Sequence, residues 1–294
     1  MQSAELSGTT AVLRHFNRTY TQRVGVLEES FLGTGRPLAV SRLLFEIGRS
    51  DGASVADLRR RLDLDSGQLS RTLRHLERDG LIETVPDESD GRRRLARLTA
   101  AGRQAWRDLD RRSEAKATGI VEALTPRQRA RLAEALMTAD LLVRAATVQL
   151  REVEVTDPLA RRAQQAFVDE LHERFGFAGG AADEPEPGST FVVATAEGSP
   201  VAYGGIRPAP DTVPDAAEVK RMWVHSDWRG AGLGSRMLRH LEQLALERGY
   251  REMVLDTNGA LAEAIALYER SGYHRIERYN DNPDAELFFR KSLR

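Results

Sequence analysis

The sequence of residues 218–235 is EVKRMWVHSDWRGAGLGS. Its first half has the composition of a β-strand, and its second half places three glycines, Gly230, Gly232 and Gly234, at the start of a predicted helix that begins near Ser235. Glycine lets the backbone approach a ligand closely and adopt dihedral angles that other residues avoid. Several backbone N–H groups can therefore converge on a pyrophosphate at the positive end of this helix. The stretch predicts a turn that binds a diphosphate.

Strands and helices alternate around this turn. The predicted strands are residues 148–155, 191–195, 201–206, 218–224, 251–256 and 286–291, and the predicted helices are residues 157–174, 235–248 and 261–271. Such alternation predicts an α/β domain. A Rossmann dinucleotide site is the competing interpretation of the glycine turn. It is disfavoured for two reasons. The turn comes late in its domain, and no acidic residue ends a strand about twenty residues after it, where such a site needs one; Asp256 is the nearest candidate.

The N-terminal half has a helical pattern. Apolar residues recur at helical spacing from Ala11 to about Leu32, and further helices are predicted at residues 38–47, 54–62, 66–78, 99–117 and 126–143. Two short strands, at residues 81–85 and 95–98, bracket a polar turn and form a hairpin. Three helices followed by a hairpin are typical of a winged helix–turn–helix domain.

The predicted helix at residues 66–78 has a polar and an apolar face. The polar face carries Ser66, Gln68, Ser70, Arg71 and Arg74, and the hairpin tip carries Arg92, Arg93 and Arg94. Gln and Ser can hydrogen-bond base edges, whereas Arg can bond guanine or pair with phosphate. We predict that these eight residues contact DNA. A merely solvated basic face is the alternative interpretation.

Length and charge distribution agree with two domains. A chain of 294 residues exceeds the size at which one hydrophobic core usually stops growing. Residues 1–150 contain 25 Lys and Arg against 20 Asp and Glu, a balance of +5, whereas the remainder contains 18 against 24, a balance of −6. The opposite balances indicate two different partners, one of them polyanionic.

Composition also excludes several classes of site. The chain has no cysteine, which excludes disulfides, thiolate metal ligands and a cysteine nucleophile. No other metal site is indicated. Charged residues interrupt the first twenty positions, so we expect no signal peptide, no membrane span and a cytoplasmic protein.

One run of motifs in the N-terminal half resembles the MarR family of bacterial regulators. It starts at Ser54-Val-Ala-Asp-Leu, continues through Gln68-Leu-Ser-Arg-Thr-Leu-Arg-His-Leu-Glu-Arg-Asp-Gly-Leu-Ile, and ends at Ser89-Asp-Gly-Arg-Arg-Arg. The resemblance covers roughly residues 10–143 and implies a winged-helix domain at residues 1–145. It also implies a homodimer, joined through the flanking helices, that binds a pseudo-palindromic site on double-stranded DNA. The short, basic wing departs from the family pattern.

The C-terminal half resembles the GNAT acetyltransferase superfamily. Arg229-x-x-Gly232-x-Gly234 matches its acetyl-CoA signature, and Asn258 with Ala264-Ile-Ala-Leu-Tyr268-Glu-Arg-Ser-Gly272-Tyr matches its second motif. The resemblance implies an α/β domain at residues 146–294 whose central mixed sheet splays open to seat the pantetheine arm of acetyl-CoA. The cofactor-binding residues that it implies are Met222, Trp223, Val224, Arg229, Gly230, Ala231, Gly232, Gly234, Ser235 and Asn258.

The same resemblance implies roles in direct acyl transfer from acetyl-CoA to an amine. Glu218 matches the position where several members carry a general base, acting directly or through water. Tyr268 matches the position that donates a proton to the departing thiolate, and a tyrosine pKa near 10 suits that role. Lys220 and Arg221 are unusual in a strand that should be interior. We hypothesise that one of them faces the acceptor and binds a carboxylate.

Three functions are consistent with these observations. The leading hypothesis is an acetyl-CoA-dependent N-acetyltransferase for a small primary amine, such as an amino acid or related metabolite, fused to a MarR-type DNA-binding regulator. The second is a regulator whose GNAT-like domain senses acetyl-CoA or a small ligand without turnover. The third is an enzyme whose winged helix serves only as a dimerisation scaffold. Glu218 and Tyr268 favour catalysis, and the polar helix with its basic wing favours DNA binding.

Overall fold

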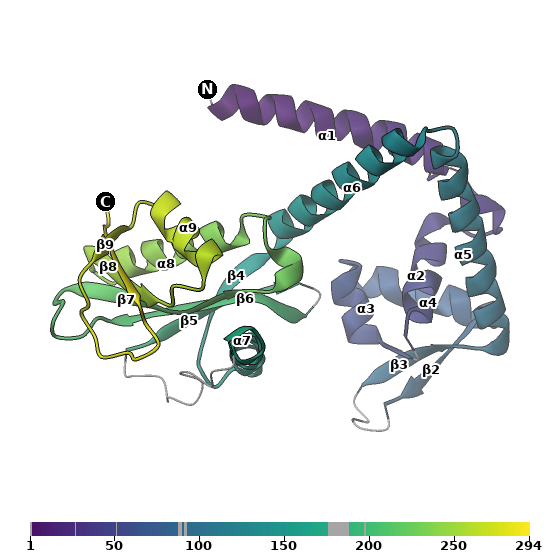
Figure 1. Cartoon of the computed structure of the whole chain (residues 1–294). Coiled ribbons are helices and arrows are strands. Elements are labelled where there is room, and N and C mark those ends of the chain that lie inside the picture. Colours follow the sequence, from purple (N-terminus) through teal and green to yellow (C-terminus); the bar gives the residue numbers. More distant parts are fainter. Residues whose placement is uncertain are drawn as a thin grey trace. The chain divides into compact units, whose positions relative to one another are not determined.

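The computed structural model describes residues 2–26, 28–50, 52–87, 90, 93–175, 188–196 and 198–294. The chain divides into two compact units, residues 1–134 and 135–294, coloured purple to teal and teal to yellow in Figure 1. The division falls within helix α6 (Pro126–Thr147). The domain boundary expected between residues 145 and 146 stays a prediction. None of the described helices is both long and apolar enough to cross a membrane.

The N-terminal unit has the winged-helix order predicted from the sequence. Its helices are α1 (Gln2–Val24), the short η1 (Phe31–Gly33), α2 (Leu38–Gly48), α3 (Val55–Arg61), α4 (Ser66–Arg78), α5 (Ala100–Val121) and the first part of α6. Strands β1 (Ala53–Ser54), β2 (Ile82–Pro86) and β3 (Arg94–Leu98) form an antiparallel sheet in the order β1-β3-β2.

The first helix differs from its predicted bounds. The apolar spacing predicts a helix from Ala11 to about Leu32, whereas α1 begins at Gln2 and ends at Val24. Gly25, which follows, has a φ of 76°, and a left-handed glycine at this position ends a helix. The prediction was wrong because it placed the helix end at the later glycines of the same segment.

Helix α4 forms where the sequence places a cap and an apolar stripe. The side chain of Asp65 accepts a hydrogen bond from the backbone N–H of Gln68 at 2.8 Å, which satisfies one free donor of the first turn. Leu69, Leu73 and Leu76 are buried in the core of this unit together with residues of α2. The opposite face of α4 is thereby left at the surface.

The start of α5 packs against the turn between α4 and β2 without room for a side chain. A Cβ atom on Gly102 would lie 1.8 Å from the carbonyl oxygen of Leu81. We expect Gly102→Ala to lower the free energy of unfolding of this unit by about 1–3 kcal/mol, although alanine is the better helix former. Gly119 is the matched control, because it lies in the same helix with open space around it. Gly119→Ala should stabilise the unit by up to about 1 kcal/mol. Calorimetric unfolding of the full chain measures both effects, and equal midpoints would contradict this packing.

The C-terminal unit is built on a seven-stranded mixed sheet in the order β4-β5-β6-β7-β8-β10-β9. The strands are β4 (Gln149–Val153), β5 (Thr190–Ala196), β6 (Ser199–Pro208), β7 (Ala216–Val224), β8 (Glu252–Thr257), β9 (His274–Ile276) and β10 (Leu287–Ser292). The pairing of β7 with β8 is parallel and the other pairings are antiparallel. This arrangement confirms the predicted α/β fold with a mixed sheet. Strand β9 was not predicted.

Helices cover both faces of this sheet (Figure 1). Helix α7 (Pro158–Phe175) packs on one face, where Ala160 and Ala163 share a core with Phe191, Tyr203 and Trp223. Helices α8 (Leu233–Glu247) and α9 (Ala262–Arg270) pack on the other face, in the largest core of the unit. The short η2 (Ser226–Trp228) leads from β7 to α8.

The last turn of α6 belongs to this second core. Ala145 and Val148 are buried in the core that α8 also fills. Arg236 of α8 donates hydrogen bonds to the carbonyl oxygens of Ala145, at 3.0 Å, and of Val148, at 2.6 Å. The guanidinium of Arg144 lies 4.8 Å from the ring centre of Trp228. The end of α6 is thereby fixed to α8.

Candidate active site and nucleic-acid interface

The two central strands of the large sheet separate to form a cleft. Strands β7 and β8 pair over three positions, and the last pair is Glu218 with Val254. Beyond it β7 continues to Val224 and β8 to Thr257 without pairing to each other. A cleft of about 1080 Å³ opens there, lined by residues of both strands. The divergence gives a ligand access to the backbone of β7.

A β-bulge in β7 lies at this cleft. Tyr203 of β6 pairs with Trp223, whereas Gly205, two residues later, pairs with Lys220, so β7 contains one extra residue. Arg221 accommodates the bulge with a φ of 54°, in the left-handed region that non-glycine residues seldom adopt. Conformations of this kind cost about 1–3 kcal/mol and concentrate at functional sites. The bulge leaves backbone groups of β7 outside the ladder, beside the cleft.

The glycine turn predicted to bind a diphosphate also lines the cleft. Gly230 and Gly232 have φ values of 81° and 76°, and a Cβ atom on either would meet open space. Helix α8 begins at Leu233, two residues before its predicted start, and its N-cap Gly232 makes no side-chain cap. The N–H groups of a first helical turn have no partner within the helix. They point outward at the positive end of the helix dipole, which fits a diphosphate.

Arg229 connects this turn to β7 and α7. Its Nε donates to the carbonyl oxygen of Val224 at 3.0 Å, and its guanidinium pairs with Glu170 of α7. Nε1 of Trp223 donates to the same carboxylate at 2.8 Å. Burial raises the pKa of Glu170, but the hydrogen bonds from Arg229 and Trp223 and the charge of Arg229 outweigh burial and lower it. Glu170 therefore offsets the positive charge of Arg229, and the sequence offered no sign of this pairing.

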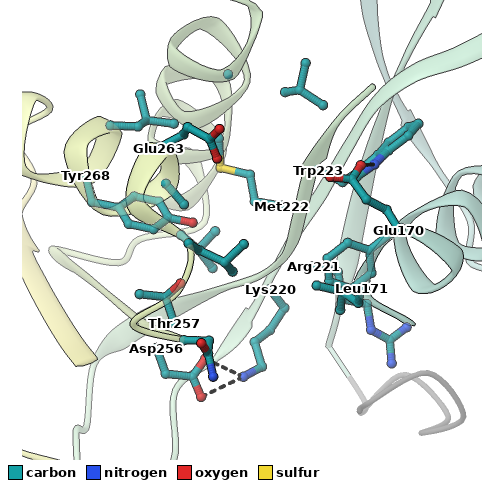
Figure 2. A pocket seen from close by; sticks show the side chains of 18 of the residues that line it. Glu170, Leu171, Lys220, Arg221, Met222, Trp223, Asp256, Thr257, Glu263 and Tyr268 are labelled. Carbon is teal, nitrogen blue, oxygen red and sulfur yellow. Dashed lines mark hydrogen bonds and ion pairs between the residues drawn. The ribbon is translucent and has the colours of Figure 1, made fainter. Parts of the chain in front are cut away.

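Tyr268 lies on α9 and lines the cleft (Figure 2). The residue is 6% exposed, and its ring packs at 6.0 Å from the ring centres of both Tyr273 and Phe289. Burial, and then the negative charge of Asp256, raise the pKa of the Tyr268 phenol above its usual value. The phenol therefore stays protonated at neutral pH. It is available to donate a proton in the cleft.

Glu218 lies behind the cleft and does not line it. Its carboxylate is fully buried and accepts four hydrogen bonds. The donors are Nε of Arg207 at 2.6 Å, the hydroxyl of Tyr279 at 2.8 Å, Nδ2 of Asn280 at 3.1 Å and Nζ of Lys220 at 3.3 Å. Tyr279, Asn280 and Lys220 share Oε1 and Arg207 contacts Oε2, and the residue has no exposed surface from which to reach a substrate directly. The general-base role stays a prediction, and in this arrangement it would have to act through one of these neighbours.

Asp256 is the carboxylate that lines the cleft at this point. Its Oδ1 accepts from Nζ of Lys220 at 3.0 Å, and its Oδ2 accepts from Nδ2 of Asn282 at 2.9 Å and of Asn280 at 3.0 Å. Burial raises the pKa of Asp256, but the charge of Lys220 and the hydrogen bonds from Asn282 and Asn280 outweigh burial and lower it. The sequence alone suggested Asp256 only as a candidate for a Rossmann site. It missed the two asparagines, because they come from the segment between β9 and β10, which carries no motif.

The remaining residues implied for cofactor binding mostly reach the cleft. Those that line it are Met222, Trp223, Val224, Arg229, Gly230, Gly232, Gly234, Ser235 and Asn258. Ala231 does not line it and packs against the core beneath α8. The side chain of Asn258 donates to the carbonyl oxygen of Asp284 at 3.0 Å and accepts from the N–H of Ala260 at 2.9 Å. It therefore shapes the wall of the cleft.

In the N-terminal unit, α4 presents the five helix residues that were predicted to contact DNA. Ser66, Gln68, Ser70, Arg71 and Arg74 are all exposed. In the wing, Arg93 and Arg94 are exposed as well, while Arg92 lies outside the described residues. Arg93 pairs with Asp90 at 3.2 Å, and Arg94 donates to the carbonyl oxygen of Thr84 at 3.3 Å. The helix thus presents exposed polar side chains on one face, of which Arg74 also donates through Nε to the carbonyl oxygen of Ser70 at 3.2 Å, and their contact with DNA stays a prediction.

Known proteins resemble the two units separately. Residues 146–273 match the model of the acetyltransferase (GNAT) family, and residues 34–93 match that of the MarR family. The chain is 35% identical over 92 residues to the uncharacterized N-acetyltransferase YjgM of Escherichia coli, which covers 31% of this chain and 55% of that protein. It is 42% identical over 60 residues to the transcriptional activatory protein BadR of Rhodopseudomonas palustris, covering 20% and 34%.

One solved structure also aligns with part of this chain. The GNAT-family acetyltransferase of Staphylococcus aureus Mu50 aligns with a TM-score of 0.41 and 14% identity, covering 50% of this chain and 100% of that one. The chain spans about half the length of the curated N-acetyltransferases YjgM and C1271.07c of Schizosaccharomyces pombe. The chain therefore combines a MarR-family segment in its N-terminal unit with a GNAT acetyltransferase-family domain in its C-terminal unit.

Proposed function

We propose that this chain is an acetyl-CoA-dependent N-acetyltransferase that acts on a small primary amine and is fused to a MarR-type regulator that binds double-stranded DNA. One observation supports the acetyltransferase activity in this proposal. The separation of β7 from β8, the uncapped start of α8 and the phenol of Tyr268 all border a single cleft. Acyl transfer from a CoA thioester needs these three features together: room beside an open strand, donors for a diphosphate, and a proton for the thiolate.

Different residues of the cleft would perform these three tasks. The N–H groups at Gly230 to Ser235 would hold the diphosphate, and the open edge of β7 at Met222 to Val224 would hold the pantetheine and the thioester carbonyl. Acetyl-CoA supplies the activated acetyl group. The amine nitrogen forms a bond to the acetyl carbon as the carbon–sulfur bond breaks, and the amine proton leaves to solvent. Tyr268 gives its proton to the thiolate and regains one from solvent.

Two carboxylates have separate tasks in this proposal. Asp256 faces the cleft and stays ionised, so it can accept a hydrogen bond from the acceptor amine and orient it. Glu218 does not line the cleft and holds Lys220, Arg207 and Asn280 in position through the hydrogen bonds that it accepts from them. We expect Asp256→Asn to lower kcat/KM for the amine by about 10- to 100-fold, as the loss of a hydrogen bond to a charged group does. Glu218→Gln should chiefly destabilise the fold, by about 3–5 kcal/mol, because it leaves buried cations without their counter-charge.

Calorimetric unfolding and steady-state kinetics on both variants distinguish these tasks. If Glu218→Gln unfolds like the wild type but loses turnover across the pH range, the general-base role predicted for Glu218 would be correct and the division of tasks proposed above would not.

Release of free thiol from acetyl-CoA, measured against a panel of primary amines, tests the enzymatic proposal. Turnover with at least one amine, absent without protein, is the expected result. Tight binding of CoA by calorimetry with no turnover on any amine would support the sensor function. If no heat of association with CoA is measured at millimolar concentration, both the acetyltransferase function and the sensor function are contradicted.

The partner proposal for the N-terminal unit rests on two exposed surfaces. The polar face of α4 is available to DNA, as described above. On α1, Val12, Leu13 and Phe16 are 71%, 56% and 46% exposed, which is unusual for apolar side chains grouped on one helix. A second copy of the chain would cover them in a homodimer. Sedimentation velocity measures the oligomeric state of the protein. A monomer at all concentrations would contradict the proposed homodimer.

A further inference from the structure

Lys220 and Asp256 face each other where the large sheet opens. The parallel pairing of β7 with β8 ends at Glu218 and Val254, and Lys220 and Asp256 each lie two residues farther along their strands. The ammonium of Lys220 lies 3.0 Å from Oδ1 of Asp256 (Figure 2). An ion pair between side chains therefore joins the two strands just beyond the end of their backbone ladder, where the cleft begins.

Lys220 also connects Asp256 to the buried Glu218. Its ammonium lies 3.3 Å from Oε1 of Glu218, so it contacts both carboxylates. Nδ2 of Asn280 makes a second connection, because it donates to Oε1 of Glu218 at 3.1 Å and to Oδ2 of Asp256 at 3.0 Å. The two carboxylates and the two donors thus form a closed ring of four hydrogen bonds.

This ring determines how the Asp256 carboxylate is oriented. Lys220 lies closest to Oδ1 and Asn280 contacts Oδ2, and both donors are held by the same oxygen of Glu218. The side chain of Glu218 is fully buried and that of Asp256 is 6% exposed, so water competes little for these bonds. A carboxylate that is held through both oxygens cannot rotate without breaking a hydrogen bond.

The charge of Lys220 acts on the same carboxylate. Burial raises the pKa of Asp256, and the charge of Lys220 is the largest of the effects that lower it. Burial, and then nearby carboxylate charge, raise the pKa values of the phenols of Tyr268 and Tyr279, so both stay protonated at neutral pH. Arg207 of β6 pairs with Glu218. Loss of Lys220 would therefore let burial raise the pKa of Asp256.

We propose that Lys220 is a positioning residue of the acetyltransferase: together with Asn280, it fixes the Asp256 carboxylate in the orientation that receives the acceptor amine. This inference rests on the proposed function and names how its acceptor site is held. The sequence suggested that Lys220 or Arg221 binds a substrate carboxylate, and in this assignment Lys220 does not. Arg221 has other surroundings, since its guanidinium carbon lies 5.8 Å from the ring centre of Phe191, in the core beside α7.

The pH dependence of kcat/KM for the amine tests this role. Lys220→Met should lower kcat/KM for the best amine of the panel by about 10- to 100-fold, as the misplacement of a substrate-positioning group does, while the KM for acetyl-CoA stays unchanged. The acid limb of the profile should also move to higher pH, because Asp256 acts in its ionised form and loses the charge that keeps its pKa low. Lys220→Arg keeps the charge and should keep the wild-type acid limb.

Two further variants isolate the ring. In the Asp256→Asn background the side chain does not titrate, so adding Lys220→Met should leave the acid limb in place. This comparison separates Asp256 from the ionisation of the amine itself, which is common to all the variants. Asn280→Ala removes the second connection without changing any charge, and it should lower kcat/KM for the amine by about 2- to 10-fold, as the loss of one hydrogen bond does.

Lys291 of β10 is the matched control. Its side chain is 24% exposed, against 25% for Lys220, and its ammonium pairs with Glu242 at 2.8 Å, but it does not line the cleft. Lys291→Met should therefore lower the unfolding midpoint as Lys220→Met does and leave the pH profile unchanged.

Two results would overturn the inference while the enzyme remains active. One is an acid limb that stays in place in Lys220→Met, and the other is a loss of kcat/KM confined to acceptors that carry a carboxylate, which would make Lys220 a substrate-binding residue. Absence of turnover in the wild type with every amine would instead contradict the proposed acetyltransferase function, and this inference with it.

Discussion

Tyr268→Phe should lower the turnover number of the proposed acetyltransferase for thiol release by about 10²- to 10⁴-fold, which is the usual contribution of a general acid. The physical reason is that the departing thiolate leaves in a cleft where Tyr268 is the buried phenol on α9. Phenylalanine keeps the ring contacts with Tyr273 and Phe289, so the fold and the KM for acetyl-CoA should change little. Stopped or continuous thiol assays at saturating substrates measure the effect.

The pH dependence provides a second test of Tyr268. Burial and the charge of Asp256 raise the pKa of this phenol, so it stays protonated beyond the usual tyrosine range near 10. Turnover of the wild type should therefore show no alkaline decline from Tyr268 below about pH 10. The control is Tyr250→Phe, since Tyr250 does not line the cleft. If Tyr268→Phe retains more than half of the wild-type turnover, another proton donor serves the thiolate.

The double substitution Arg71→Ala and Arg74→Ala weakens DNA binding by about 1–3 kcal/mol for each arginine that contacts a base. Both side chains are exposed on α4, beside Gln68 and Ser70, where a recognition helix reads the major groove. For each arginine that contacts phosphate, the slope of log affinity against log salt should also decrease by about one. Fluorescence anisotropy with promoter DNA across a salt series measures both quantities.

Arg103 gives a matched control for this second prediction. It is exposed on α5, outside the helix and the wing, and Arg103→Ala should leave the salt slope unchanged. An unchanged affinity in the double variant would leave the winged helix as a scaffold for dimerisation. Loss of affinity for all sequences alike, with the salt slope reduced by about two, would show that the two arginines contact phosphates and carry no sequence information.

Local signals in the sequence predicted most of the fold. The polar and apolar faces of residues 66–78 and the glycines at 230 and 232 each act within a few residues, and the structure has helices at these places. The wing strands are confirmed for the same reason, whereas the mixed sheet was implied by the resemblance to the GNAT superfamily and is confirmed by the strand pairings. Strand β9 was missed because it has only three residues, too few for a period to show.

The contacts of the candidate site could not be predicted in the same way. Glu218 is joined to Tyr279 and Asn280, which lie 61 and 62 residues away along the chain. Glu170 pairs with Arg229 across 59 residues. A motif identifies which positions carry chemistry, but the partners that fill a carboxylate come from tertiary packing. The bulge that turns Arg221 toward α7 likewise depends on its pairing with β6.

The hydrogen bonds from Arg236 to the end of α6 determine where a fragment containing the C-terminal unit can begin. A recombinant fragment starting at residue 146 would match the family boundary but would lack Arg144 and Ala145, so Trp228 would lose the cation above its ring and Arg236 one of its two acceptors. A fragment that starts at residue 135 keeps these contacts. The helix that ends the N-terminal unit is thus also the first structural element of the C-terminal unit, so a fragment cut at the first strand of the large sheet loses contacts of its own core.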